Sequence, residues 1–420
     1  MQSIAVIGAG ITGVTTAYEL IRRGFAVTVY DRNRYAAMDT SFANGGQLSA
    51  SNAEVWNHPA TILKGLKWLL KADAPLSLSL SPSWHKYSWL VEFVANIPNY
   101  RANTTKTAKL AVAARQRMRD IAAAEGIAFD RDDHGILHFY ATEAEMAHAR
   151  RVSELLAAGG VERIELDAEG IRRLEPRLKA DFIGGFHTPG DATGDIHLFA
   201  TGLAEACRRH GTDFRMETEI LSCQTDRDGV EIRFRGHDGA VRQASHAGVV
   251  VCAGIGSRDL ARGLGDRLNI YPVKGYSITV NLQDDASRAA APQMSLLDDA
   301  AKIVTSRLGP DRFRVAGTAE FSGANRDIQA CRIRPLIDWV NRCFPDVSTR
   351  QVVPWAGLRP MMPSMMPRVG PGRRGGVFYN TGHGHLGWTL STATAELVAQ
   401  SVAAHYGGQP FHTRVFPAMA

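Results

Sequence analysis

The sequence predicts an α/β protein with two domains, the second of which is an α+β domain built on an antiparallel sheet. Three observations lead to this prediction. A strand, a glycine-rich turn, a helix and a second strand follow one another within residues 2–31. Apolar and polar residues alternate through residues 212–251 and 273–320, which is typical of antiparallel strands. The length of 420 residues exceeds what one ordinary hydrophobic core holds.

The N-terminal unit has the order of a Rossmann-type nucleotide-binding motif. Residues 4–7 form an apolar run that predicts a short buried strand, and the pattern G-x-G-x-x-G follows at Gly8, Gly10 and Gly13. An amphipathic helix comes next. A second strand ends at Asp31, eighteen residues after Gly13, near the offset expected for an acid that binds a ribose hydroxyl.

Each part of this motif has a physical role in binding a dinucleotide. Gly8 permits the tight turn, Gly10 lets the backbone approach a pyrophosphate, and Gly13 lets the helix pack closely on the strand. The first turn of the helix offers free N–H groups and a positive dipole end to the phosphates. A carboxylate at Asp31 accepts hydrogen bonds from the ribose and disfavours a 2′-phosphate.

Two later segments favour FAD over NAD as the dinucleotide. Residues 248–257, GVVVCAGIGS, predict a buried strand that runs into Ala253 and Gly254. Residues 377–389, VFYNTGHGHLGWT, predict a strand, a glycine-rich turn and a helix that starts near Thr389. Turns of small residues let backbone N–H groups meet the carbonyl oxygens of a flavin ring. In an NAD-linked dehydrogenase the C-terminal glycines would have no role.

Six segments resemble those of the FAD-dependent D-amino acid dehydrogenases, relatives of glycine oxidase, D-amino acid oxidase and sarcosine oxidase. They are GAGITG at 8–13, TSFANGGQLS at 40–49, TGDIHLF at 193–199, YPVKGYS at 271–277, WAGLRPMMP at 355–363 and NTGHGHLGW at 380–388. They follow the family order over nearly the whole chain. Within the family, SNAEVWNHP at 51–59 and PSWHK at 82–86 are closest to the bacterial branch linked to cis-4-hydroxy-D-proline.

This resemblance implies a noncovalently bound FAD whose ring lies between residues 44–48 and 382–389. His383 and His385 stand among glycines, where histidines often act as simple loop hydrogen-bonders, so neither is expected to be catalytic. The predicted cofactor-binding residues are Gly8, Gly10, Ile11, Thr12, Gly13, Asp31, Arg32, Ser41, Asn44, Gly45, Gly46, Gln47, Leu48, Ala253, Gly254, Gly382, His383, Gly384, His385, Leu386, Gly387 and Thr389.

An arginine is the best ligand for the carboxylate of an amino acid, because its planar fork pairs with both oxygens. We expect Arg359 to follow a strand and to precede Pro360, which a central strand does not tolerate. From pattern alone, an ion pair at the surface or between domains is the better interpretation. The resemblance implies instead that this GLRP arginine binds the substrate carboxylate.

The other predicted catalytic residues are aromatic. The resemblance implies that Tyr276, in KGYS, places a hydroxyl near the substrate, although a strand tyrosine usually packs. Tyr271 and His58 complete the predicted set, and Glu54 is a further candidate. Lys274 is expected to be solvated, with a water-mediated position near the flavin as the alternative.

Two inserts of strands and helices interrupt the cofactor segments, so the FAD-binding domain is predicted to be discontinuous. A small substrate would bind in the cleft between the domains. The predicted FAD-binding domain comprises residues 1–54, 195–272 and 356–410, and the substrate-binding domain comprises 55–194 and 273–355. The predicted helices include 105–125, 195–210 and 335–344, and the predicted strands include 134–140, 182–190 and a meander over 212–251.

Composition excludes several other classes of protein. The net charge is +6, but no dense block of Lys and Arg has interleaved aromatics, so no nucleic acid is expected as a partner. Five scattered cysteines without a C-x-x-C pair predict buried reduced thiols in the cytoplasm, with no metal site and no disulfide framework. Neither a signal peptide nor a membrane-spanning segment is expected. The oligomeric state is not predicted.

The leading interpretation is oxidative deamination of a D-amino acid, with hydride transfer from Cα to flavin N5 and hydrolysis of the imino acid to a 2-oxo acid and ammonia. The resemblance implies a quinone as the electron acceptor. The alternatives are a cyclic D-imino acid dehydrogenase acting on D-proline or cis-4-hydroxy-D-proline, an oxygen-using oxidase, and a flavin subunit of an electron-transfer complex.

Residues 59–71, PATILKGLKWLLK, predict a cationic amphipathic helix. Such a helix suits peripheral binding to the inner face of the cytoplasmic membrane. Packing of its apolar face on the core of the chain itself is the commoner use of such a pattern.

Overall fold

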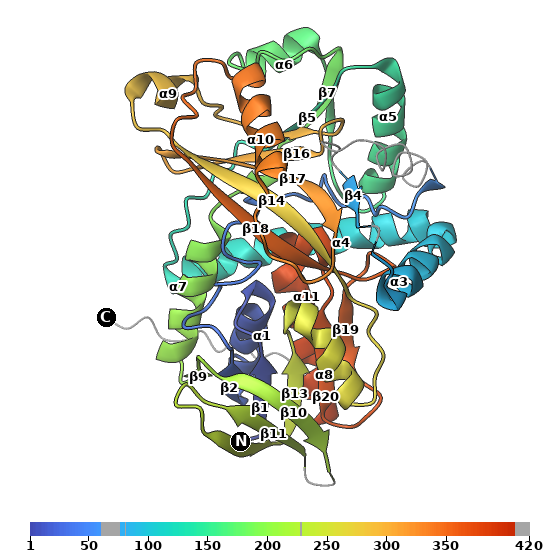
Figure 1. Cartoon of the computed structure of the whole chain (residues 1–420), viewed down its shortest axis with the longest axis vertical. Coiled ribbons are helices and arrows are strands. Elements are labelled where there is room, and N and C mark those ends of the chain that lie inside the picture. The colour runs from blue at the N-terminus through green and yellow to red at the C-terminus, as the bar shows by residue number, and fades with distance from the viewer. Residues whose placement is uncertain (60–75, 80, 227–228, 408–420) are drawn as a thin grey trace.

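The computed structural model describes residues 1–59, 76–79, 81–226 and 229–407. Its lower half in Figure 1 contains a six-stranded sheet in the order β19-β20-β13-β1-β2-β9. The strands of this first sheet are β1 (Ser3–Ile7), β2 (Ala26–Tyr30), β9 (Asp213–Arg215), β13 (Gly248–Val251), β19 (Arg368–Pro371) and β20 (Val377–Thr381). Neighbouring strands are parallel except β19, which runs antiparallel to β20 at one edge.

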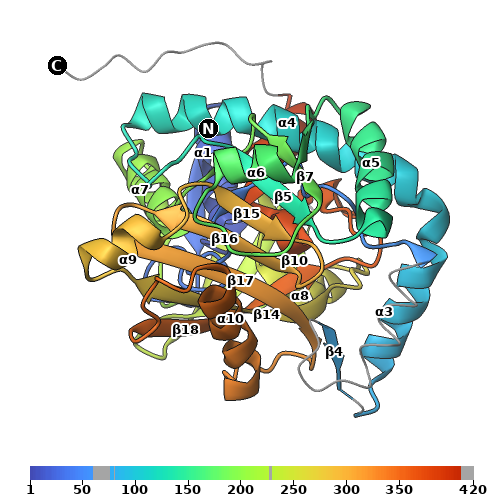
Figure 2. The same ribbon diagram turned by 90° about the horizontal axis from the view of Figure 1, so that it is seen from above.

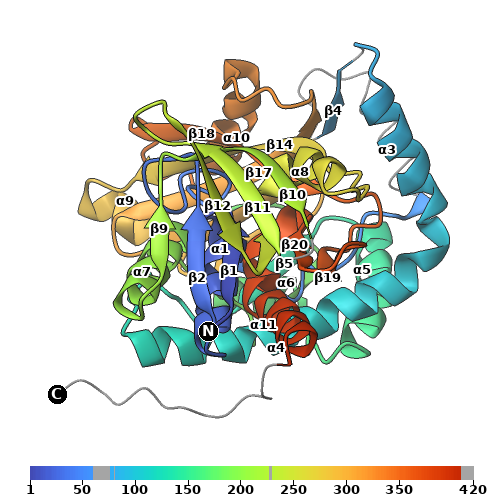
Figure 3. The ribbon, with the colours of Figure 1, turned by 90° about the horizontal axis from the view of Figure 1, so that it is seen from below.

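The first sheet is the middle of three layers, because the side chains of β1 alternate between two apolar cores. Ile4 and Val6 face a core shared with four helices, while Ala5 and Ile7 face a core shared with a small antiparallel sheet. Figure 3 shows β10, β11 and β12 of that small sheet beside β1 and β2. The elements of the two outer layers are α1 (Ile11–Ile21), α4 (Tyr100–Glu125), α7 (Ile196–Arg209) and α11 (Gly387–His405) on one side, and β10 (Glu219–Thr225), β11 (Val230–Arg235) and β12 (Val241–His246) on the other.

The upper half of Figure 1 is built on a nine-stranded sheet in the order β18-β14-β17-β16-β15-β5-β7-β6, with β4 paired to β17. Most pairs are antiparallel, as predicted, but β15–β5 and β17–β4 are parallel. Helix α10 (Ala330–Cys343) covers one face over β14 and β17 (Figure 2). The strands are β4 (Leu76–Leu78), β5 (Ile136–Tyr140), β6 (Ile164–Asp167), β7 (Gly184–Thr188), β14 (Tyr271–Asn281), β15 (Ser295–Asp298), β16 (Ile303–Leu308), β17 (Arg312–Phe321) and β18 (Val352–Met361).

The fold class is therefore the predicted one: an α/β unit around a parallel sheet, joined to an α+β unit on a largely antiparallel sheet. The domain limits themselves stay a prediction. The remaining elements are β3 (Gln47–Leu48), β8 (Ala192–Thr193), α3 (Trp84–Ala95), α5 (Glu143–Ala157), α6 (Ala168–Leu174), α8 (Ser257–Gly263), α9 (Asp285–Ala290), and the 3₁₀ turns η1 (Ile97–Asn99), η2 (Gly254–Gly256) and η3 (Gly384–Leu386).

Three local predictions were wrong. The meander is confined to β10–β12, because β9 and β13, at the two ends of 212–251, join the parallel sheet. Helix α10 starts at Ala330 and holds Pro335 in its second turn, although proline is typical of a helix start. Cys331 is exposed, whereas the other four cysteines are buried thiols.

Within the described residues, no helix is long and apolar enough to cross a membrane, and no group of His, Cys, Asp and Glu could hold a metal ion. The predicted amphipathic helix at 59–71 lies, apart from Pro59, outside those residues.

Candidate active site

The turn between β1 and α1 needs two of its three glycines for packing. Gly8 has a φ of +108°, and a Cβ there would be 2.6 Å from the carbonyl oxygen of Cys252. A Cβ at Gly13 would overlap the Gly8 carbonyl. At Gly10, by contrast, a Cβ would meet only Ser41 Oγ, at 3.4 Å. The packing of the chain therefore does not require glycine at this position, although the approach of a phosphate does.

Polar groups around this turn are arranged for an anionic nucleotide. The first turn of α1 contains no acidic residue, and its N-cap, Gly10, has no side chain that could cap the backbone N–H groups there. Ser41 Oγ accepts from the Ile11 N–H at 3.0 Å. Asp31, at the end of β2, accepts from the Ala9 N–H at 2.6 Å and from Asn33 N–H at 2.8 Å. These bonds orient the Asp31 carboxylate at the cavity wall, where the remaining lone pairs of its oxygens can accept hydrogen bonds from ribose hydroxyl groups.

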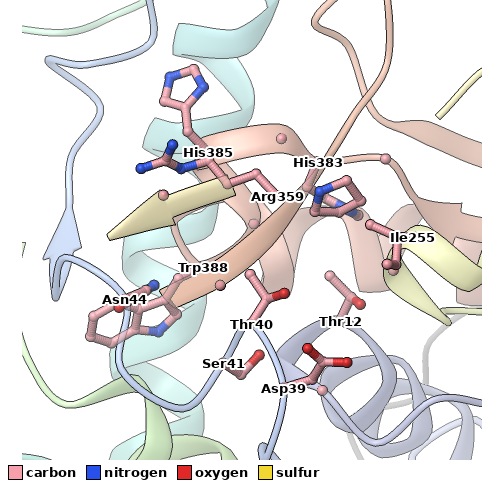
Figure 4. Close-up of a pocket in the computed structure, with 18 of the residues that line it drawn as sticks. Thr12, Asp39, Thr40, Ser41, Asn44, Ile255, Arg359, His383, His385 and Trp388 are labelled. Atoms are coloured by element: carbon pink, nitrogen blue, oxygen red, sulfur yellow. The ribbon is translucent and has the colours of Figure 1, made fainter. Parts of the chain in front are cut away.

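A single cavity of about 1250 Å³ connects this turn to the antiparallel sheet. Figure 4 shows Thr12 and Ser41 at the α1 end, with Arg359, His383 and His385 at the other. The predicted residues that line the cavity are Gly8, Gly10, Ile11, Thr12, Asp31, Arg32, Ser41, Asn44, Gly45, Gly46, Gln47, His58, Ala253, Gly254, Tyr276, Arg359, Gly382, His383, Gly384, His385 and Gly387.

Five predicted site residues do not line it. Gly13 packs against Gly8, and Leu48 lies in β3 beside Ala192. Leu386 is in the apolar core, while the Thr389 hydroxyl accepts from the Ser49 N–H at 3.2 Å. Tyr271 is stacked on Phe321, with ring centroids 5.7 Å apart, in a separate apolar cluster. These five residues are therefore not placed to contact a ligand in the cavity directly.

Several buried polar atoms on the cavity wall have no hydrogen-bond partner within the described part of the chain. They are Gln47 Oε1, Thr318 Oγ1, His385 Nδ1 and Trp388 Nε1. A buried donor or acceptor without a partner costs about 1–3 kcal/mol. A polar planar ligand with both acceptors and donors, such as a flavin, supplies the partners that these atoms lack. Trp388 and Thr318 were not predicted, because no local pattern marks them.

Arg359 is half-buried on the cavity wall, and no acidic residue of the described ranges is paired with it. Its Nη1 donates to the Thr318 carbonyl at 2.7 Å, and no carboxylate of the described residues forms an ion pair with it. Burial lowers the pKa of Arg359 to about 10, so it stays charged at neutral pH. A cation in this state is a receptor for an anion. The prediction that it follows a strand was wrong: β18 continues through Arg359 and Pro360, which it tolerates because it is the edge strand.

The structure corrects the predicted placement of Tyr276 and Lys274. Both side chains lie on the face of β14 opposite Gly275, whose Cα faces Arg359, since alternate residues of a strand point to opposite faces. The Tyr276 hydroxyl donates to Glu320 at 2.8 Å and so points away from Arg359, although Tyr276 is one of the residues that line the cavity. Lys274 is fully buried and pairs with Glu320 at 3.1 Å; it is neither solvated nor at the cavity.

The two histidines of the C-terminal turn are neutral. Burial lowers the pKa of His383 to about 3, and its Nε2 shares a hydrogen bond of 2.9 Å with Thr394. Burial and the charge of Arg359 together lower the pKa of His385 to about 4. His385 stacks on Trp56 with ring centroids 4.9 Å apart. Rings with such low pKa values do not exchange protons near neutral pH, and the expectation that neither histidine is catalytic stays a prediction.

A polar cluster lines the cavity near Trp56. Glu54 Oε1 accepts from the Tyr100 hydroxyl at 2.6 Å and lies 3.3 Å from His148 Nε2. Burial raises the pKa of Glu54, but hydrogen bonds from His148 and Tyr100 outweigh burial and lower it overall. His58 packs edge-on against Tyr100. Sequence reasoning missed His148 and Tyr100, which come from helices far along the chain.

Comparison with known proteins identifies the family. A family model described as FAD dependent oxidoreductase matches residues 3–401. The chain belongs to this family. D-amino acid dehydrogenase 3 of Mesorhizobium japonicum is 57% identical over 96% of this chain and 97% of its own. The D-amino acid dehydrogenase of Paramagnetospirillum magneticum is 40% identical over 96% of this chain and 95% of its own.

Solved structures show the same fold. Glycine oxidase from Bacillus cereus aligns over 98% of this chain and 97% of its own, with a TM-score of 0.73 and 19% identity. L-proline dehydrogenase from P. horikoshii aligns over 98% and 95%, with a TM-score of 0.74 and 15% identity. The protein is thus an FAD-dependent oxidoreductase, and the glycine turn, Asp31 and the unpartnered atoms of the cavity wall fit that cofactor.

Proposed function

We propose that this FAD-dependent oxidoreductase is a D-amino acid dehydrogenase, which oxidises the Cα–N bond of its substrate to an imine that hydrolyses to a 2-oxo acid and ammonia. The observation that supports this most directly is Arg359, a half-buried cation on the cavity wall that donates a hydrogen bond to the Thr318 carbonyl. Two relatives that match nearly the whole chain, at 57% and 40% identity, are named D-amino acid dehydrogenases.

The residues of the chain bind and orient the substrate in this proposal. The fork of Arg359 pairs with both carboxylate oxygens, and its contact with Thr318 fixes the plane of the guanidinium. The neutral His383 and His385 form a wall beside it without adding charge. Bound FAD supplies the hydride acceptor, so the chain needs no nucleophile.

Anaerobic reduction of the bound flavin tests the proposal. We expect D-amino acids to bleach the absorbance of the flavin much faster than their L-isomers in stopped-flow mixing. Equal rates, or faster reduction by L-isomers, would overturn the assignment of the substrate and leave the assignment to the FAD-dependent oxidoreductases untouched.

A cyclic D-imino acid is the second candidate substrate. The flat surface of Trp56 stacked on His385, beside Arg359, suits the packing of a saturated ring. A D-proline or cis-4-hydroxy-D-proline that reduces the flavin faster than D-alanine would favour this candidate, and the product would then be a pyrroline.

The electron acceptor in this proposal is a quinone rather than oxygen. We expect fast turnover with a soluble quinone or a dye and slow turnover with oxygen. A rate with oxygen equal to that with the dye would identify an oxidase, and activity that requires a second protein would identify a flavin subunit of a larger complex.

Peripheral binding to an anionic membrane belongs to the same proposal. It rests on the sequence of residues 59–71, which carry Lys64, Lys67 and Lys71. Vesicles that contain anionic lipid should retain the protein at low salt and release it at high salt. Replacing the three lysines with Gln should abolish retention while dye-linked activity persists.

A further inference from the structure

We propose that Lys274, Glu320 and Tyr276 are positioning residues for Arg359: from the far face of the sheet they hold the backbone bulge whose carbonyl orients the guanidinium in the cavity. This inference rests on the proposed role of Arg359 as the ligand of the substrate carboxylate.

The bulge lies in β17, directly opposite β14. Lys274 pairs with Glu320 and Tyr276 pairs with Gly317, so Thr318 and Ala319 together oppose the single residue Gly275. Thr318 has a φ of +61°, a left-handed conformation that a β-branched residue rarely adopts. Its carbonyl accepts the hydrogen bond from Arg359. Such strain persists only where the surrounding structure enforces it.

The enforcing contacts are on the face of the sheet opposite to Arg359. Glu320 accepts at both oxygens: Lys274 Nζ is 3.1 Å from Oε1, and the Tyr276 hydroxyl donates to Oε2 at 2.8 Å. Lys274 also donates to Asn325 Oδ1 at 3.3 Å and to the Asp327 carbonyl at 3.2 Å. Lys274 and Glu320 form the register pair at one end of the bulge, and Tyr276 belongs to the pair at its other end. The three side chains therefore fix both ends of the bulge.

A buried ion pair is poor evidence of a contribution to stability, because desolvation of the two charges offsets their attraction. In this proposal the effect of the pair is on geometry, because it fixes the backbone conformation of β17 at the bulge. None of the three side chains reaches the Arg359 face of β14, so they can influence a carboxylate ligand only through the bulge.

The test measures discrimination between a carboxylate and the matching amide in the FAD-loaded enzyme. The ratio of kcat/KM for D-alanine to that for D-alaninamide reports on Arg359, and the ratio of dissociation constants for benzoate and benzamide gives a readout independent of turnover. The variants are Tyr276→Phe and the double replacement of Lys274→Met with Glu320→Gln. Tyr379→Phe is the matched control, because the Tyr379 hydroxyl also donates to a carboxylate, Asp266, at 2.9 Å, and Tyr379 does not line the cavity.

We expect both reverse-face variants to lower the preference for the carboxylate roughly 3- to 30-fold, the range seen for indirect coupling, with FAD content unchanged and the control at the wild-type ratio. A wild-type ratio in Tyr276→Phe would overturn the inference even if the double variant does not fold, as would an equal loss for acid and amide. A wild-type ratio in Arg359→Met would instead refute the role of Arg359 itself, so the two failures are distinguishable.

Discussion

Gly275 lies against the guanidinium of Arg359: a Cβ built on this glycine would be 2.5 Å from Cζ and 2.7 Å from Nη1. A glycine inside a strand weakens it, and a close approach by another group is a common reason for its presence. Here the approaching group is the cation proposed to bind the substrate, so the space above Gly275 is part of the binding site.

The first prediction is that Gly275→Ala displaces Arg359. The added methyl group would push the guanidinium away from the Thr318 carbonyl and raise KM for a D-amino acid by roughly 10- to 100-fold, as small misplacements do. Steady-state kinetics with a dye checks this. Gly375→Ala is the control and should match the wild type, because among the described residues a Cβ there would contact only His405, at 3.8 Å. An unchanged KM in Gly275→Ala would show that the site tolerates displacement of the cation.

The second prediction concerns Arg359 directly. Arg359→Ala should lose about 2–5 kcal/mol of transition-state stabilisation, which is roughly 30-fold or more in kcat/KM. Arg359→Lys keeps the charge but loses the fork, so its activity should also fall. FAD content, from the ratio of visible to ultraviolet absorbance, should stay near the wild-type value. Full activity in Arg359→Ala would mean that another residue binds the carboxylate.

The third prediction separates cofactor binding from folding within one turn. Gly10→Ala should fold normally yet release FAD, because its methyl group has room in the chain but occupies the approach of the pyrophosphate. Gly13→Ala should instead lower the free energy of unfolding by about 1–3 kcal/mol, because its methyl group overlaps the Gly8 carbonyl. Denaturation of the flavin-free proteins, with FAD titration of each, distinguishes the two effects.

The fourth prediction is a loss of stability in mild acid. Burial lowers the pKa of His383 to about 3, and burial with the charge of Arg359 lowers that of His385 to about 4. A histidine in the unfolded chain has a pKa of about 6.5. Between these values the unfolded chain binds more protons than the folded one, so the free energy of unfolding falls as pH falls below ~6.5. Each histidine contributes about 1.4 kcal/mol per pH unit in this window.

Above pH 7 the contribution of both histidines should be constant. Urea unfolding at pH 5.0, 6.0 and 7.5 measures the slope. The double variant His383→Asn with His385→Asn should have a shallower slope, and an identical slope would show that these two rings do not titrate as their burial implies.

Local signals explain why much of the fold was predictable. The conformation of the turn from β1 to α1 is determined by residues that are adjacent in the sequence. The same holds for the end of α4, where Gly126 adopts a φ of +64°. The residues predicted to bind the phosphates follow from the same short motif. These features need no knowledge of distant partners.

The remaining features depend on partners far along the chain. All of residues 271–278 in β14 are buried, so no alternation of polar and apolar residues reveals which face meets the cavity, and Tyr276 could not be placed. Arg359 was expected beyond a strand because Pro360 argues against a central strand, and only the sheet order shows that β18 is an edge. The bulge at Thr318 arises from pairing between β17 and β14, which no local pattern marks.

The same edge strand bears on how the protein behaves at high concentration. Pro354 and Pro360 are six residues apart in β18, so their nitrogens face the same side of the strand, and β18 stays paired with β14 through both of them. Their missing N–H groups therefore lie on the open edge, where Val353 and Pro354 are exposed. A bare strand edge invites another chain to add to the sheet, and prolines there block that addition. The strand that carries Arg359, the cation proposed to bind the substrate, thus also has an edge that resists the addition of another chain.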